Sequence, residues 1–255
     1  MGNTTVHLRG RANLDALLAA LDRAAGLFSA EQVIFSGTSA GGLAVYLHAS
    51  YVKGLLGKGA RLFGVPDAGF FMDSGTYTNA SDHALARELA GAYGLWNVSL
   101  GGAGAACVAA AAPGAQSRCL LAEVVYPHLT DVDGMWLINS LVDPSQLRLC
   151  FGLDCALGAT CTPAQTAAIQ AYAGRLQRTM QAAVAVFGAR DGYFLTTCAH
   201  HEQSCRFEDW YQVRIGGGSP NASLAAFVAG GASRFVDSPW PGDGSCWVAP
   251  LHGGC

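Results

Sequence analysis

Residues 33–43 of the chain read Val33-Ile34-Phe35-Ser36-Gly37-Thr38-Ser39-Ala40-Gly41-Gly42-Leu43. The first three residues are β-branched or aromatic, which is typical of a buried strand in a parallel sheet. Small residues follow around Ser39, and after them apolar side chains recur at helical spacing from Leu43 until Gly57. This stretch therefore predicts a strand, a tight turn at Ser39 and a helix.

The turn has the pattern of a nucleophile elbow, in which a serine is presented on a strained bend between a strand and a helix. Gly37 lies two residues before Ser39 and Gly41 two residues after it. A serine held in this way can attack an ester carbonyl once a base removes its proton. The backbone N–H of Ala40 would then be one donor to the oxyanion. The same pattern also occurs as an ordinary glycine-rich turn, so the partners of Ser39 decide between the two interpretations.

Further strands and helices are predicted on either side of this stretch. Apolar runs predict strands at 61–65, 136–138 and 193–195, and apolar periodicity predicts helices over 13–27, 43–56 and 163–184. Asn13 is the expected cap of the first helix, and Pro163 lies in the first turn of the last. Strands that alternate with helices indicate an α/β fold with a mostly parallel sheet covered on both faces.

The composition favours one α/β domain over residues 1–255, with a Gly-, Ser- and Pro-rich tail at 216–255 that we expect to be mostly loop fastened by cysteines. The formal net charge is -3, and no run of Lys or Arg could follow a phosphate backbone. No apolar stretch reaches the roughly 18 to 20 residues that cross a bilayer. We therefore expect no nucleic-acid partner and no membrane span; the sequence leaves the oligomeric state open, with a monomer as the expectation.

The acid and the base of a serine triad would follow Ser39 in that order along the chain. The candidate acids at strand exits are Asp67, Asp73, Asp131, Asp133, Asp143 and Asp191. Spacing favours Asp143, which follows the 136–138 run after a short loop, although an aspartate before Pro144 could simply cap a helix.

The candidate bases after Asp143 are His200, His201 and His252. The adjacent pair follows a predicted strand, and chemistry alone leaves the choice between His200 and His201 open. Their run with Glu202 lacks the spacing of a metal site. We expect neither a metal nor an organic cofactor.

Cysteine usage points to an oxidising compartment. The chain has nine cysteines and no CxxC pair, so disulfides are a more probable use than a zinc site. Asn-x-Ser/Thr sequons at Asn3, Asn79, Asn97 and Asn221 agree with a secreted protein. The segment after Met1 has neither a basic nor an apolar region, so no signal peptide is visible. Together with the odd cysteine count, this leads us to expect that the true start lies upstream.

Five blocks, taken in order, resemble the pectin acetylesterase family, which includes the Wnt deacylase Notum. They are Leu8-Arg9-Gly10, Ser36-Gly37-Thr38-Ser39-Ala40-Gly41-Gly42-Leu43-Ala44 with His48 downstream, Asp67-Ala68-Gly69-Phe70-Phe71-Met72-Asp73, Ile138-Asn139-Ser140-Leu141-Val142-Asp143-Pro144-Ser145-Gln146 and Cys198-Ala199-His200-His201-Glu202-Gln203. Cys107, Cys119, Cys155, Cys161 and the segment Asp209-Trp210-Tyr211 also match.

This resemblance implies an α/β-hydrolase-like three-layer sandwich and a serine carboxylesterase with the triad Ser39, Asp143 and His201. The base is assigned to His201 rather than His200 because the family has Cys-x-x-His, counted here from Cys198. The implied substrate is an O-acetyl ester on pectin or a similar extracellular polysaccharide, and the implied location is extracellular or the cell wall.

The chain departs from the family in lacking a Gly-Gly-Gly-Trp-Cys-like segment, which supplies the second oxyanion donor. We therefore expect the N-terminal strands of the fold to be missing. Two alternatives to a polysaccharide acetylesterase follow. One is a Notum-like enzyme that removes a fatty acyl group from a protein, and the other is a non-catalytic homologue that acts as a binding protein.

Overall fold

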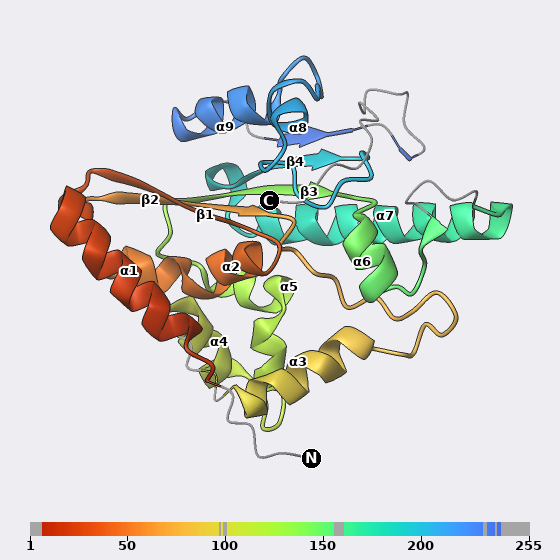
Figure 1. Ribbon diagram of the computed structural model, residues 1–255, viewed down its shortest axis with the longest axis horizontal. Coiled ribbons are helices and arrows are strands. Elements are labelled where there is room, and N and C mark those ends of the chain that lie inside the picture. The colour runs from red at the N-terminus through yellow and green to blue at the C-terminus, as the bar shows by residue number, and fades with distance from the viewer. Residues whose placement is uncertain are drawn as a thin grey trace.

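The computed structural model describes residues 7–96, 98, 101–155, 161–231, 234–237 and 239–240. Within these residues, five parallel strands form one sheet in the order β1-β2-β3-β4-β5 (Figure 1). The strands are β1 Gln32–Thr38, β2 Arg61–Asp67, β3 Gly134–Ser140, β4 Gly192–Thr196 and β5 Arg234–Val236. Because all five run in the same direction, the loops that follow them meet at one edge of the sheet.

Helices lie on both faces of this sheet. Figure 1 shows α8 and α9 above the sheet, and α2, α5 and α7 below it. The α-helices are α1 Gly10–Ala25, α2 Ala40–Lys53, α3 Ala84–Leu95, α4 Ala103–Ala110, α5 Ala122–Val125, α6 Pro144–Leu149, α7 Pro163–Ala185, α8 Phe207–Tyr211 and α9 Pro220–Val228, and short 3-10 turns occur at Leu27–Ser29, Gln116–Leu120, Tyr126–His128 and Gly188–Arg190. The predicted α/β fold with a parallel sheet between helical layers is confirmed.

The central strand β3 divides its side chains between two hydrophobic cores. Met135 and Leu137 belong to the larger core, together with side chains of α2 and α7. Trp136 and Ile138 point to the opposite face and belong to a smaller core that includes Phe227 of α9. Successive side chains of a strand alternate between the faces of a sheet, so one buried strand stabilises both layers.

The strand before Ser39 is less buried than its residues predict. In the described part of the chain β1 pairs only with β2, which makes it an edge strand. Ile34 is 48% exposed, and Val33 and Phe35 are partly buried. A run of three apolar residues predicts a strand, but it does not say how many neighbours cover that strand.

Several predicted boundaries differ from the structure. The first helix begins at Gly10 after Arg9, so Asn13 lies inside it and does not cap it. The second helix ends at Lys53 rather than at Gly57. The tail predicted to be mostly loop contains α9 and β5, whereas residues 241–255 lie outside the described part of the chain. Short elements of this kind give a weaker periodic signal than the long helix α7 does.

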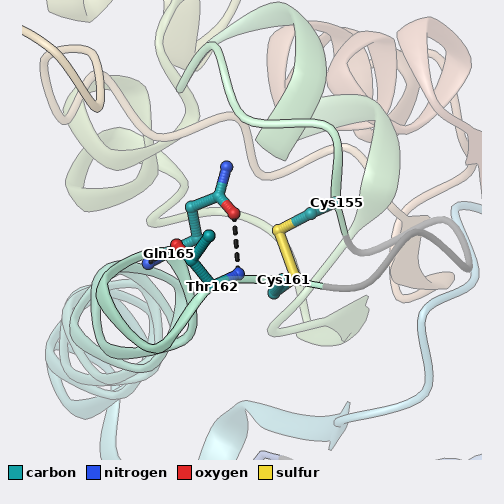
Figure 2. Close-up of a disulfide and its surroundings, with 4 residues drawn as sticks. All are labelled: Cys155, Cys161, Thr162 and Gln165. Atoms are coloured by element: carbon teal, nitrogen blue, oxygen red, sulfur yellow. Dashed lines mark hydrogen bonds between the residues drawn. A yellow bond between two sulfur atoms is a disulfide. The ribbon is translucent and has the colours of Figure 1, made fainter.

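Disulfides fasten two of the connections. Cys107 pairs with Cys119, and Cys155 pairs with Cys161 directly before α7. Figure 2 shows the second bond beside the start of α7, where the Gln165 side chain accepts a hydrogen bond from the backbone N–H of Thr162. Cys198 and Cys205 are also disulfide-bonded, whereas Cys150 is a free thiol. This cysteine usage matches the disulfides expected from the sequence.

Candidate active site

Ser39 lies on a strained turn between β1 and α2. Its backbone angles are φ 54° and ψ -120°, and a positive φ is uncommon for a residue other than glycine. The backbone N–H of Ser39 donates to the carbonyl oxygen of Asp67 at 2.9 Å, which fixes the turn to the end of β2. A strained residue persists only where its surroundings hold it, and such residues cluster at functional sites.

Two glycines permit this turn through close backbone contacts. A Cβ atom on Gly37 would lie 2.4 Å from the carbonyl oxygen of Gly41, and one on Gly42 would lie 2.5 Å from the carbonyl oxygen of Asp67. By contrast, a Cβ on Gly41 would meet nothing within 4 Å. The steric requirement at the C-terminal side of Ser39 therefore falls on Gly42, whereas the sequence pattern had drawn attention to Gly41.

His201 connects Ser39 to Asp143. Its Nε2 atom lies 2.7 Å from the Oγ of Ser39, and its Nδ1 atom lies 2.8 Å from Oδ2 of Asp143. Both contacts have the length of a hydrogen bond. In the neutral imidazole, Nδ1–H donates to the carboxylate of Asp143 and Nε2 accepts from the hydroxyl of Ser39. The imidazole is thus oriented as a base for Ser39.

Asp143 is completely buried at the exit of β3. Its Oδ1 atom accepts hydrogen bonds from the backbone N–H groups of Ser145 at 2.8 Å and Gln146 at 3.2 Å, and it thereby caps α6. Its Oδ2 atom remains available to His201. The sequence left a capping role and a triad role as alternatives; one oxygen atom of Asp143 caps α6, and the other contacts His201.

The surroundings of His201 raise its affinity for a proton. Burial of the ring opposes the charged form, but the hydrogen bond and the negative charge of Asp143 outweigh burial, with smaller contributions from Glu202 and Asp67. The pKa of His201 is consequently raised above the ordinary histidine value. An imidazole that takes a proton readily suits a general base.

The other candidate bases and acids have different places. His200 binds Asp209 through Nδ1, at 2.9 Å from Oδ1, and His252 lies outside the described residues. The remaining acids contact other groups: Asp67 binds Ser204, Asp73 binds His83, Asp131 binds Ser50, Asp133 binds Lys53, and Asp191 binds Arg190 and Tyr126. Among the described side chains, the structure brings Asp143 and His201 to Ser39.

Ala40 is the first residue of α2, next to Ser39. The first N–H groups of a helix have no partner within it, and the helix dipole places partial positive charge there. Ala40 is exposed, so its N–H can face a bound ester.

His48, in the same helix, lies away from this end; burial lowers its pKa, and its charged neighbours are Arg11 and Asp15 of α1.

Two contacts near the triad could not be deduced from spacing. Gln146 is completely buried, and its Oε1 accepts from the Tyr172 hydroxyl of α7 at 3.0 Å, which ties α6 to the neighbouring layer. Asp67 accepts from Ser204, which lies far along the chain. The only signal in the sequence is that Asp67 and Gln146 stand in the blocks that resemble the family.

In the part of the chain that the structure describes, no group of three or more His, Cys, Asp or Glu side chains could hold a metal ion. No helix among those residues is long and apolar enough to cross a bilayer.

Comparison with known proteins places the chain in a family. Two crystal structures of the Wnt deacylase Notum from Drosophila are similar at 23% identity. One has a TM-score of 0.76 and covers 93% of this chain, and the other has a TM-score of 0.74 and covers 91%. This chain spans 66% and 63% of those two Notum chains, respectively. The likeness confirms the α/β-hydrolase-like fold. A family model described as Pectinacetylesterase matches residues 1–247, and the protein therefore belongs to the pectinacetylesterase family.

Proposed function

We propose that the protein is a serine carboxylesterase that hydrolyses O-acyl esters with Ser39 as nucleophile, His201 as base and Asp143 as the orienting acid. The observation that carries this proposal is the continuous hydrogen-bonded chain from Ser39 Oγ through the imidazole to Asp143. The strained backbone of Ser39 and the raised pKa of His201 support the same roles. Membership of the pectinacetylesterase family agrees with an ester substrate.

The reaction would proceed through an acyl-enzyme. His201 Nε2 takes the hydroxyl proton while Ser39 Oγ attacks the ester carbonyl carbon, and the N–H of Ala40 donates to the oxyanion. The C–O bond to the alcohol then breaks, and His201 returns the proton to the departing hydroxyl. Water attacks the acyl-serine with the same imidazole as base, and the carboxylic acid leaves as Ser39 regains its proton.

The proposed substrate is an O-acetyl ester on pectin or a similar extracellular polysaccharide. The family description is the support for this choice. The disulfides Cys107–Cys119 and Cys155–Cys161 support an oxidising compartment, which is where an extracellular enzyme would fold. The sequons at Asn79 and Asn221 are both on exposed residues, as glycosylation in such a compartment would require.

A matched pair of serine variants tests the proposal. Ser39→Ala should abolish hydrolysis of p-nitrophenyl acetate and release of acetate from acetylated pectin, with a loss on the order of 10⁴-fold or more. Ser36→Ala is the control, because Ser36 lies in β1 just before the turn and its hydroxyl donates to the carbonyl oxygen of Val65 instead. Activity that survives Ser39→Ala would contradict the role of Ser39 as nucleophile. A folded wild-type chain that hydrolyses neither ester would contradict the proposal as a whole and leave a non-catalytic binding protein as the better interpretation.

The similarity to Notum structures supports a second candidate, removal of a fatty acyl group from a protein. A series of p-nitrophenyl esters from acetate to palmitate separates the two. An acetylesterase should lose kcat/KM as the acyl chain lengthens, whereas a fatty-acyl deacylase needs an apolar pocket and should gain roughly 1 kcal/mol or less of binding per added CH₂. Rising kcat/KM from butyrate to octanoate would favour the deacylase.

A further inference from the structure

A second buried carboxyl group lies beside the triad, at the end of β2. Asp67 is completely buried and is located between the turn that carries Ser39 and the His201 loop, which we define as residues 198–205. We propose that Asp67 is a positioning residue that holds the His201 loop against the nucleophile turn and acts electrostatically on the imidazole. The inference rests on the proposed function, since it concerns the base of that reaction.

The side chain of Asp67 binds the loop that carries the base. Its Oδ2 atom accepts from both the backbone N–H and the hydroxyl of Ser204, each at 2.7 Å, and the carboxyl also accepts from the backbone N–H of Gln203. Ser204 comes three residues after His201 in the chain. Hydrogen bonds to a carboxylate are among the stronger ones in proteins. This group of contacts fixes the loop close to the imidazole.

The backbone of the same residue binds the nucleophile turn. The Asp67 carbonyl oxygen accepts from the N–H of Ser39 at 2.9 Å, and Asp67 is in register with Thr38 across the β1–β2 pair. The following residue, Ala68, has a positive φ of 50°, so the chain bends sharply here. One residue therefore sets the distance between the two groups that exchange a proton: its backbone holds Ser39, and its side chain holds the loop of His201.

A buried carboxyl group costs folding free energy, so Asp67 would be unfavourable if it only filled space. Burial raises the pKa of Asp67 to about 6 despite the hydrogen bonds from Ser204, and its Oδ1 atom is buried without a hydrogen-bond partner among the described residues. The nearby charge of Glu202 acts in the same direction. Buried ionisable groups with a shifted pKa are concentrated at functional sites.

The charge of Asp67 gives this residue a second effect on the base. Together with Asp143 and Glu202, it raises the pKa of His201. The imidazole becomes positively charged when it accepts the serine proton, so a nearby negative charge stabilises that state of the reaction. Asp67 acts through His201 and does not itself contact Ser39 Oγ.

Two substitutions separate the geometric effect from the charge. Asp67→Asn keeps the shape and one acceptor but removes the charge, so the pKa of His201 and the acidic limb of kcat/KM should move to lower pH by about half a pH unit. Asp67→Ala also removes the anchor and should lower kcat by about 10- to 100-fold with KM within about threefold, because a small misplacement of a catalytic group is costly. The His201 pKa is measured by NMR titration of the imidazole, assigned with His201→Ala.

Asp237→Asn is the matched control. The Asp237 carboxyl also accepts from the backbone N–H and the hydroxyl of a single residue, Thr197, at 3.1 and 2.8 Å. Asp237 follows β5, however, which is at the opposite end of the strand order from β1, the strand before Ser39. This variant should leave kcat and the acidic limb unchanged. Equal shifts of the His201 pKa and of the acidic limb in Asp237→Asn and Asp67→Asn would show a general effect of loosening the loop and would overturn the proposal.

The outcomes distinguish this inference from the proposed function. The NMR titration needs no turnover, so it tests the effect of Asp67 even on an inactive chain, and an unchanged His201 pKa in a folded Asp67→Asn variant overturns the inference. Unchanged kcat in Asp67→Ala would do the same while Ser39→Ala remains inactive. Hydrolysis that survives Ser39→Ala contradicts the proposed function instead, whatever the titration shows. Circular dichroism establishes that each variant is folded.

Discussion

The strands β1 and β3 are each followed by one member of the proposed triad, yet they differ sharply in burial. β1 is an edge strand with Ile34 48% exposed, whereas every residue of β3 is buried. The proposed nucleophile has to meet a substrate, and Ser39 follows a strand that is paired on one side only among the described residues. The proposed acid has to orient a base away from water, and Asp143 follows a strand whose residues are all buried. The fold thus separates access from rigidity.

The largest effect is expected on the β3 side of this comparison. Asp143→Asn should lower kcat by about 10⁴-fold, because the amide favours the wrong tautomer of His201 while the cap of α6 survives. Steady-state kinetics with p-nitrophenyl acetate measures the loss. Asp131→Asn is the control, since the Asp131 carboxyl accepts from Ser50. A loss of less than tenfold in Asp143→Asn would show that Asp143 does not orient His201.

The next effect concerns stability rather than rate. Trp136→Ala in β3 removes one of the largest fully buried side chains and should lower the free energy of unfolding by about 3 to 5 kcal/mol. Urea denaturation followed by circular dichroism gives the value. Trp136→Phe keeps most of the volume and removes an indole N–H that is buried without a hydrogen-bond partner in the described part of the chain, so it should cost less than the alanine variant. Equal costs for both variants would show that packing at β3 is not the cause.

The pH profile tests whether Asp143, the residue at the exit of β3, stabilises the charged form of His201. His201 must be neutral to act as base, and its pKa is raised, so the acidic limb of kcat/KM should have its midpoint above the ordinary value of about 6.5. Activity should fall by about tenfold per pH unit below that midpoint. A midpoint below 6.5 would contradict the charge stabilisation by Asp143.

The same raised pKa has the opposite effect on folding stability. A histidine with a higher pKa in the folded state stabilises the fold fully below its unfolded pKa, and this contribution is lost as the pH rises through the folded value. Activity should therefore increase over the pH range in which this contribution to stability decreases. The difference in thermal stability between wild type and His201→Gln, followed from pH 5 to pH 8, measures this contribution of His201.

The smallest effect is expected on the edge strand. Ile34→Thr keeps a β-branched residue at an exposed position and should change the free energy of unfolding by about 0.5 kcal/mol or less, with kcat unchanged. Denaturation under the conditions used for Trp136→Ala allows direct comparison. A cost of several kcal/mol would mean that β1 is covered in solution and that the contrast with β3 is wrong.

The elements with strong local signals could be predicted from the sequence. The strand and helix on either side of Ser39, the run at 136–138 and the long helix from Pro163 are all present. The exposure of β1 could not be predicted because it depends on which strands pair beside it. The short helix α9 and strand β5 were missed because glycine- and serine-rich composition hides elements of few residues.

The site was predictable as far as motif and chain order reach. From chemistry alone His200 and His201 were equivalent, and only the family register favoured His201. In the structure each ring contacts an aspartate, and what distinguishes them is that Nε2 of His201 lies 2.7 Å from the Oγ of Ser39. The contact between Asp67 and Ser204 joins residues 137 positions apart, and no periodicity encodes such a pairing. Long-range polar contacts depend on strand order, which local patterns do not contain.

The free thiol of Cys150 lies close in sequence to a disulfide that it could attack by thiol–disulfide exchange. Burial is the main cause that raises the pKa of Cys150 to about 12, with the nearby charge of Asp143 acting in the same direction. At neutral pH the thiolate fraction is then on the order of 10⁻⁵, and the thiolate is the species that attacks disulfides. Cys150 precedes the Cys155–Cys161 bond by only a few residues, yet it is a very slow partner for exchange. The Cys155–Cys161 bond is thus protected kinetically against attack by Cys150 as long as the thiol stays buried.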